Sequence, residues 1–118
     1  MFQFDQSFGM ETRQEEIFDK VAKDVVDSAL EGFNGTIFAY GQTGSGKTFT
    51  MTGGTSSYED RGLIPRTLSY IFNECKSRSG DFKVNISYLQ IYQSVGYDLL
   101  AVENVTKKLE DLPRVEPR

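Results

Sequence analysis

Residues 35–48 read GTIFAYGQTGSGKT, an apolar run that leads directly into a glycine-rich loop. The apolar part, residues 36–40, predicts a fully buried strand because polar and apolar positions do not alternate in it. A helical stripe of apolar residues precedes this strand over residues 17–30, and Phe2 and Phe4 alternate as in a short strand before that. The order strand, helix, strand, loop and helix indicates an α/β fold with a mostly parallel sheet.

The glycine-rich loop, residues 41–48, satisfies the pattern G-x-x-x-x-G-K-[ST] between a predicted strand and a predicted helix. Glycines let backbone N–H groups approach phosphate oxygens, Lys47 is long enough to reach the β and γ oxygens, and the Thr48 hydroxyl can ligate Mg²⁺. The alternative is a Gly/Ser-rich turn that fits by chance, which at average residue usage has a probability well under ~1%. The predicted phosphate-binding residues are Gly41, Gln42, Thr43, Gly44, Ser45, Gly46, Lys47 and Thr48.

The flanking segments predict two long helices and a loop between them. Thr12 stands three residues before Glu15, the spacing of a capping box, so the first helix is expected to begin there and to end at a left-handed Gly32. Residues 53–60 predict a surface loop, and Pro65 suits the first turn of a helix that fades over residues 77–80.

The last part of the chain predicts one more strand, because apolar residues alternate over residues 82–92 and later fill both faces. From Ser94 onward the pattern decays. We therefore expect one domain over residues 1–118, with an ordered part over about 2–100 and poor order over 101–118.

Composition excludes several classes of protein. The 13 Lys and Arg against 17 Asp and Glu give a net charge of -4, which argues against a nucleic-acid or anionic-membrane binder. No apolar run approaches the ~20 residues that span a bilayer, and no leader pattern begins the sequence. The absence of His excludes His-ligated metals and Ser-His-Asp chemistry, and leaves Cys75 as a small buried hydrophobe rather than a nucleophile.

A complete hydrolytic site also needs an acidic partner for Mg²⁺ and a group that orients water. The carboxylates near predicted strand ends are Asp5 and Asp98. A solvated turn is the favoured interpretation of Asp5, and a helix or turn cap that of Asp98. The catalytic residues therefore stay unknown.

The wider stretch from Gly35 to Met51 closely resembles the kinesin motor domain, and its surroundings agree. Gln14 to Phe18 is similar to the family's Q-x-x-[VI]-[FY] helix start, and residues 62–66, GLIPR, match its G-[IL]-I-P-R segment. Residues 86–92, ISYLQIY, with the later DLL, resemble its S-Y-[LV]-E-I-Y-N-E and D-L-L signatures. The resemblance covers residues 2 to about 100. The TFTMTGG stretch and residues 108–113 are more similar to the kinesin subfamily of cilia and flagella than to conventional transport kinesins.

The resemblance implies a P-loop NTPase-type fold and an ATPase that couples ATP and Mg²⁺ to microtubule binding, with no nucleic-acid or membrane partner. It implies a location in the cytoplasm on the microtubule cytoskeleton, in a cilium or flagellum for that subfamily. By position, residues 41–48 correspond to the ATP phosphate loop, Thr48 to the Mg²⁺ ligand, and Phe49 to the aromatic or His position near the nucleotide. Residues 53–61 correspond to a variable loop that tunes nucleotide exchange.

The chain departs from the family pattern in ways that leave alternatives open. Gln90, Gln93 and Ser94 replace the E, N and E of E-I-Y-N-E, and the R-x-R-P, N-x-x-S-S-R-S-H and D-L-A-G-S-E segments do not occur. The sequence thus resembles the first third of a motor, an incomplete fold. The alternatives are an ATP-driven motor segment, a non-hydrolysing nucleotide-binding fragment that binds tubulin weakly or not at all, and a different P-loop NTPase. The third is disfavoured because these motifs have no reason to occur together elsewhere.

Overall fold

The computed structural model describes residues 1–100, 114 and 115. The chain divides into two compact units, Met1–Gly80 and Asp81–Arg118, each described by itself. The ordered limits predicted above are not tested, because residues 101–113 and 116–118 lie outside the described residues.

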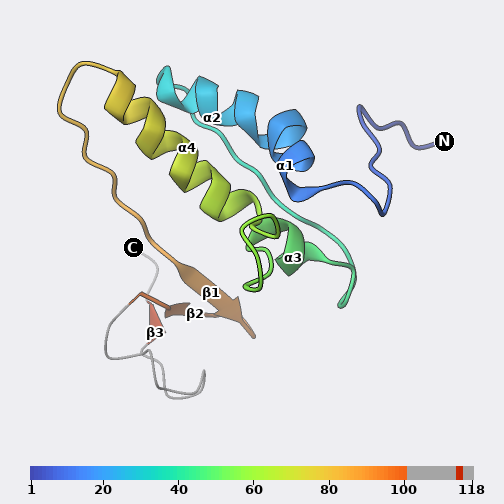
Figure 1. Ribbon diagram of the computed structural model, residues 1–118. Coiled ribbons are helices and arrows are strands. Elements are labelled where there is room, and N and C mark those ends of the chain that lie inside the picture. Colours follow the sequence, from blue (N-terminus) through green and yellow to red (C-terminus); the bar gives the residue numbers. More distant parts are fainter. Residues whose placement is uncertain (101–113, 116–118) are drawn as a thin grey trace. The chain divides into compact units, whose positions relative to one another are not determined.

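The first helical stretch of the chain is long and continuous (Figure 1). It consists of α1 (Gln14–Ile17), the π-helical segment η1 (Phe18–Ala22) and α2 (Lys23–Leu30). The predicted capping box is wrong, because the N-cap is Arg13 and no side chain caps the helix. The predicted end is confirmed. Gly32 has φ 104°, its N–H donates to Ala29 O, and the next N–H, of Phe33, donates to Ser28 O, which is the Schellman arrangement.

The segment that follows, residues 33–40, runs back along this helix without pairing as a strand (Figure 1). A Cβ placed on Gly35 would lie 2.6 Å from Val25 Cγ1, so glycine is needed for the close approach. Ile37 packs against the core, whereas Phe38 and Tyr40 are 82% and 94% exposed. The prediction of a buried strand over 36–40 is wrong for this structure, because the described residues supply no neighbouring strand to accept its hydrogen bonds.

The glycine-rich loop leads into α3 (Lys47–Met51), and α4 (Leu63–Ser77) completes the first unit. Both helices confirm the sequence pattern, with Pro65 in the first turn of α4. Cys75 is half-buried rather than buried. In the part of the chain that the structure describes, no helix is both long and apolar enough to cross a membrane.

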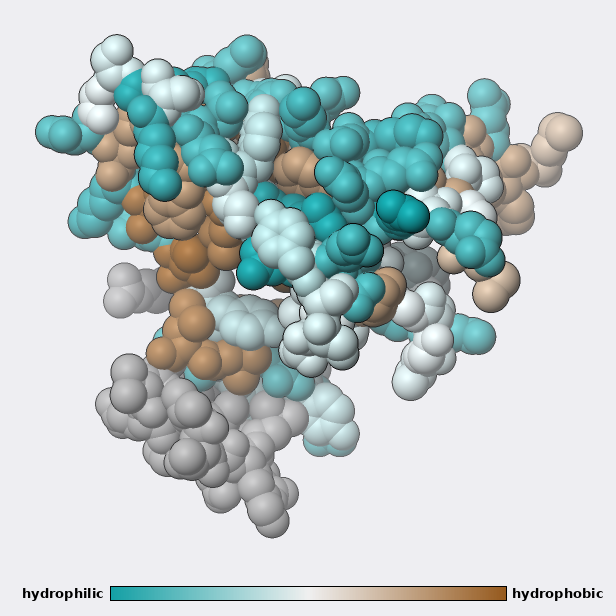
Figure 2. Space-filling model, in the orientation of Figure 1, coloured by the Kyte–Doolittle hydropathy of each residue, from teal (hydrophilic) through white to brown (hydrophobic). Residues whose placement is uncertain are grey.

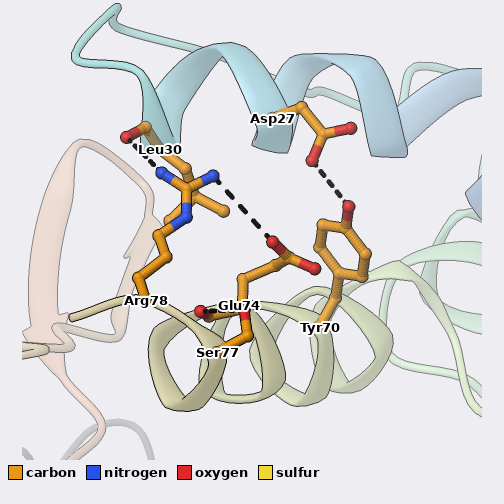
Figure 3. Close-up of polar contacts among 6 residues, drawn as sticks. All are labelled: Asp27, Leu30, Tyr70, Glu74, Ser77 and Arg78. Carbon is orange, nitrogen blue, oxygen red and sulfur yellow. Dashed lines mark hydrogen bonds and ion pairs between the residues drawn. The ribbon is translucent and has the colours of Figure 1, made fainter.

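Two polar contacts hold α4 against α2, as Figure 3 shows. The Tyr70 hydroxyl donates to Asp27 Oδ1 at 2.7 Å. Arg78 Nη1 donates to Leu30 O, one of the last carbonyls of α2, at 3.3 Å, and Arg78 Nη2 lies 3.9 Å from Glu74 Oε2. Because the end of a helix leaves carbonyls without helical donors, the Arg78 contact satisfies a group that α2 cannot.

The core of this unit is small. Phe18, Ala22 and Leu63 form one buried cluster, around which Ile17, Ile37, Met51 and Tyr70 pack with part of their surface exposed. Val26 of α2 is buried as well. Apolar atoms are correspondingly visible among polar ones on the face shown in Figure 2. The helices are thus held by a single apolar cluster where η1, α3 and α4 meet.

The second unit contains a three-stranded antiparallel sheet in the order β1 (Leu89–Tyr92), β2 (Val95–Asp98) and β3 (Arg114–Val115). Gln93 and Ser94 both have positive φ, 49° and 64°, and close a two-residue hairpin between Tyr92 and Val95. The predicted strand over 82–92 is confirmed only in its last four residues, and all of residues 82–92 are exposed.

The predicted mostly parallel sheet is therefore not present among the described residues, whose paired strands are all antiparallel. Phe2 and Phe4, expected in a short strand, are likewise exposed and unpaired. Both misses have one cause: apolar character favours a strand, but a strand exists only where another backbone takes its hydrogen bonds.

Candidate functional site

The glycine-rich loop forms a tight turn at the start of α3. Ser45 N–H donates to Gln42 O at 3.2 Å, and Gly44 and Gly46 have φ of 80° and 95°. A side chain at either glycine would be strained by this left-handed backbone, although no atom lies within 4 Å of the Cβ position. The glycines therefore allow the turn and leave its surface bare.

Lys47 folds back across this loop. Its ammonium donates to Gly41 O at 2.8 Å and to Gln42 O at 2.7 Å. Lys47 is half-buried, and an ammonium group has three donors, so these two contacts leave one donor for another acceptor. The Thr48 side chain next to it is exposed, and its hydroxyl bonds no group of the described residues.

Backbone donors at the start of α3 are also free. The first backbone hydrogen bond of this helix runs from Thr50 N to Gly46 O at 2.9 Å. Within the described ranges, the N–H groups of Gly46, Lys47 and Thr48 donate to no protein acceptor. An ammonium, a hydroxyl and free N–H groups make a donor set suited to an anion with several oxygens, and a hydroxyl is an oxygen ligand of the kind Mg²⁺ takes.

A hollow of about 420 Å³ lies beside α3. Phe49, with 51% of its surface exposed, lines it together with Tyr58 and Arg66. Two aromatic side chains and one cationic side chain therefore line the same hollow, and one of them, Phe49, is two residues after Lys47.

The segment after α3, residues 52–62, is closed at its base. Gly53 and Arg61 form an isolated antiparallel bridge, Gly54 N–H donates to Asp60 O at 2.9 Å, and Gly62 N–H donates to Thr52 O at 3.1 Å. A Cβ on Gly53 would collide with the Asp60 carbonyl oxygen and the Gly62 nitrogen. Arg66, from α4, donates to Arg61 O and Glu59 O at 2.8 and 2.9 Å, so the loop is anchored from outside as well.

The two carboxylates weighed as Mg²⁺ partners have the surroundings expected of turns. Asp5 is exposed at a bend. Asp98 ends β2, and its Oδ1 accepts a hydrogen bond from Leu100 N–H at 2.9 Å. The structure therefore brings residues 41–49 together at α3. Within the first unit Asp5 is not among them, and Asp98 belongs to the second unit, which is described by itself.

Sequence reasoning missed one residue beside this site. The sequence indicates only a helix start at Gln14, yet this residue is 5% exposed and its side-chain amide donates to Phe49 O and Asp60 O. The only available signal was a glutamine at the boundary of an apolar stripe, and that signal does not reveal which carbonyls it will meet.

Comparisons with known proteins agree with one another. The model of the kinesin motor domain family matches residues 1–115. The chain is 47% identical over 112 residues to Kinesin-related protein 13 of Dictyostelium discoideum, covering 92% of this chain and 9% of that protein. It is 52% identical over 88 residues to Kinesin-like protein KLP1 of Chlamydomonas reinhardtii, covering 74% of this chain and 11% of that protein. A solved fast kinesin is similar with a TM-score of 0.81 and 44% identity, over 87% of this chain and 30% of that one. The chain thus spans about a tenth of the length of these curated relatives.

Proposed function

The chain belongs to the kinesin motor domain family, and on that premise we propose that it is the ATP-binding part of a microtubule-based motor. Kinesin motor domains are ATPases that bind microtubules, and kinesins are associated with that part of the cytoskeleton. The observation that carries the proposal for this chain is the GQTGSGKT loop at the start of α3, with its left-handed glycines and Lys47 folded across it.

The proposed phosphate contacts come from residues 41–48. Free N–H groups and the bare glycines accommodate phosphate oxygens, and Lys47 exchanges its contacts with the loop carbonyls for the β and γ oxygens. Thr48 is the proposed Mg²⁺ ligand. A bound Mg²⁺ would supply positive charge that offsets the negative charge of the phosphates.

The base of the nucleotide is proposed to lie near Phe49. This ring is half exposed and lines the 420 Å³ hollow beside Tyr58. An adenine ring is flat and apolar on its faces, so an exposed aromatic side chain two residues past Lys47 is a suitable neighbour.

The phosphate role is tested with the Lys47→Ala variant in a thermal-shift assay. We expect Mg·ATP to raise the melting temperature of the unmodified chain, because a ligand at a hundredfold its dissociation constant stabilises by about 2.7 kcal/mol. Lys47→Ala should abolish the shift, while Lys76→Ala, an exposed lysine of α4, should retain it. Equal shifts in all three proteins would exclude the phosphate role of Lys47.

The alternative, nucleotide binding without turnover, predicts a different result with microtubules. The 118 residues carry a net charge of -4, and an acidic tubulin surface calls for a basic face on its partner. We therefore expect this chain alone neither to sediment with microtubules at physiological salt nor to hydrolyse ATP faster in their presence. A stimulated rate that disappears in Lys47→Ala would contradict the alternative and favour a competent motor.

We also propose membership of the kinesin subfamily of cilia and flagella. The TFTMTGG sequence over residues 48–54 supports this assignment. Residues 108–113, which also resemble that subfamily, lie outside the described residues. A tagged protein that stays on cytoplasmic microtubules and is excluded from the cilium in ciliated cells would count against this assignment.

A further inference from the structure

Gln14 forms a buried cross-link between three segments of the first unit. Its amide nitrogen donates to Phe49 O at 2.6 Å and to Asp60 O at 3.3 Å. Among the described residues Gln14 is the one polar residue that is buried, with 5% of its surface exposed. A buried amide nitrogen that donates to two acceptors is a specific contact, because removing it takes a hydrogen-bond donor from each acceptor in a place where water does not replace it.

The first acceptor, the Phe49 carbonyl, has lost its helical donor. Thr52 N–H and Gly53 N–H both donate to Thr48 O, at 2.8 and 3.1 Å, so the N–H that would serve Phe49 O in a regular helix goes elsewhere. The Gln14 amide takes its place. The position of the end of α3 is therefore set partly by a side chain from the start of the long helix.

The second acceptor, the Asp60 carbonyl, belongs to the base of the closed loop. It also accepts from Gly54 N–H at 2.9 Å, next to the bridge between Gly53 and Arg61. One amide group thus bonds both the last turn of α3 and the turn that closes the following loop, and Figure 1 draws that loop beside α3.

We infer that Gln14 is a positioning residue that couples the loop of residues 52–62 to α3 and, through α3, to Lys47 and Thr48. Helix α3 has only five residues, so a movement of the Phe49 carbonyl is transmitted to Lys47 within little more than one turn. A ligand that moves Lys47 then changes the conformational equilibrium of the loop. By reciprocity, a change in the loop shifts the equilibrium of Lys47 by the same free energy. The nucleotide part of this inference rests on the proposed function.

The link itself is tested without nucleotide, by hydrogen exchange of the 118-residue chain with Gln14→Met. Methionine keeps the length and apolar volume of the side chain and removes both donors. We expect the amides of Thr50 in α3 and Gly54 in the loop to exchange roughly five- to tenfold faster together, the loss of about one net hydrogen bond. The amides of Phe33 and Arg78, which bond Ser28 O and Glu74 O, should not change.

The matched control is Gln6→Met, the same change at an exposed glutamine. If Gln14→Met does not fold, the same link is tested with Gln14→Glu, whose exchange protection is measured as a function of pH. A protonated carboxyl keeps one O–H donor and an ionised one keeps none, so Thr50 and Gly54 should lose protection relative to Phe33 as pH rises through the carboxyl pKa. Faster exchange in only one of the two segments, or an equal rise at Phe33, would overturn the coupling.

The nucleotide part is tested with a fluorescent reporter. The chain has no Trp, so Tyr58→Trp places a single indole in the loop. With Mg·ATP as the probe, the reporter chain should change its emission, and adding Gln14→Met should remove that change while binding persists about tenfold more weakly. Absence of binding in the reporter chain means that the proposed function has failed, and hydrogen exchange then decides the link. Binding with an emission change that Gln14→Met leaves intact would overturn the coupling.

Discussion

At the scale of single residues, Tyr70 and Asp27 make the polar contact that most clearly alters a chemical property. The hydrogen bond to the Asp27 carboxylate, helped by partial desolvation and by the nearby charges of Asp27 and Glu74, raises the pKa of Tyr70 to about 12. Arg78 opposes this, and the Lys23 ammonium lies 5.9 Å from the centre of the Tyr70 ring. Tyr70 therefore keeps its proton in the folded chain well above its ordinary range.

This pKa gives a pH dependence whose sign is fixed. Between about pH 10 and about 12 the folded chain holds a proton that the unfolded chain has lost, so the free energy of unfolding falls as pH rises. The stabilising effect of the hydrogen bond is fully present below pH ~10. We expect Tyr70→Phe to be less stable than the unmodified chain at pH 8, and the difference to shrink across that window.

The measurement is urea unfolding of both proteins at several pH values, followed by circular dichroism. The difference between them isolates Tyr70, because the other tyrosines and the lysines titrate in both. A difference that stays constant or grows up to pH 12 would show that the Tyr70 contact with Asp27 does not stabilise the fold.

The residues of the phosphate loop were predictable, and their neighbours were not. The pattern fixes Gly44, Gly46 and Lys47 by local chain geometry, so the loop and the helix after it follow from sequence alone. Gln14 and Arg66 act on carbonyl groups that come close only after folding. No local pattern marks which backbone oxygens a long polar side chain will reach.

At the scale of elements, the stretch from Gln14 to Leu30 shows what periodicity can and cannot tell. Its apolar stripe predicts one helix, and the chain does form one continuous helical stretch. The π-helical segment η1 within it is not visible in the stripe, although it places both Phe18 and Ala22 in the core. A π segment adds a residue to one turn, and its stability depends on packing rather than on local preference.

The predicted strands agree with the structure less well than this helix does. Residues 36–40 and 82–88 have strand-like composition, yet neither segment forms a strand among the described residues. The hairpin of β1 and β2 forms where the apolar pattern decays after Ser94, because a two-residue turn brings the next segment alongside as a partner strand. The apolar pattern indicates which segments favour an extended backbone, and it does not indicate which of them find a partner.

The packing of η1 leads to a prediction for Phe18. Its ring is 7% exposed, lies beside Ala22 and Leu63, and meets the Tyr70 ring edge-on at 5.9 Å between centroids. Phe18→Ala should destabilise by about 3–5 kcal/mol, the range for a buried Phe. The control Phe33→Ala, at a residue 67% exposed, should change stability by no more than about 0.5 kcal/mol.

Chemical unfolding monitored by helical circular dichroism measures both variants. Because single domains have total stabilities of roughly 5–15 kcal/mol, a loss of this size should move the midpoint of unfolding of the Phe18 variant to a clearly lower denaturant concentration. Similar transition midpoints for the two variants would mean that the cluster around Leu63 does not hold the helices together.

At the scale of the whole molecule, the balance between buried and exposed apolar surface matters most. The described residues bury few apolar side chains, and the exposed ones include Phe2 at 92%, Phe4 at 78%, Phe38 at 82% and Tyr40 at 94%. Burying apolar surface yields roughly 25 cal/mol for each Å², so these side chains represent free energy not used in folding the chain. Large exposed apolar side chains of this kind promote association.

The last prediction follows from that surface and from the unpaired backbone of residues 36–40. An extended apolar segment with free N–H and C=O groups can pair with a second copy of itself, which gives it the neighbouring strand that the described residues lack. We expect the apparent mass from light scattering to rise with concentration. Phe38→Ser with Tyr40→Ser should lower that rise, whereas Tyr58→Ser, at a loop residue 68% exposed, should leave it unchanged. A constant monomer mass up to high micromolar concentration, with a sharp cooperative unfolding transition, would contradict it.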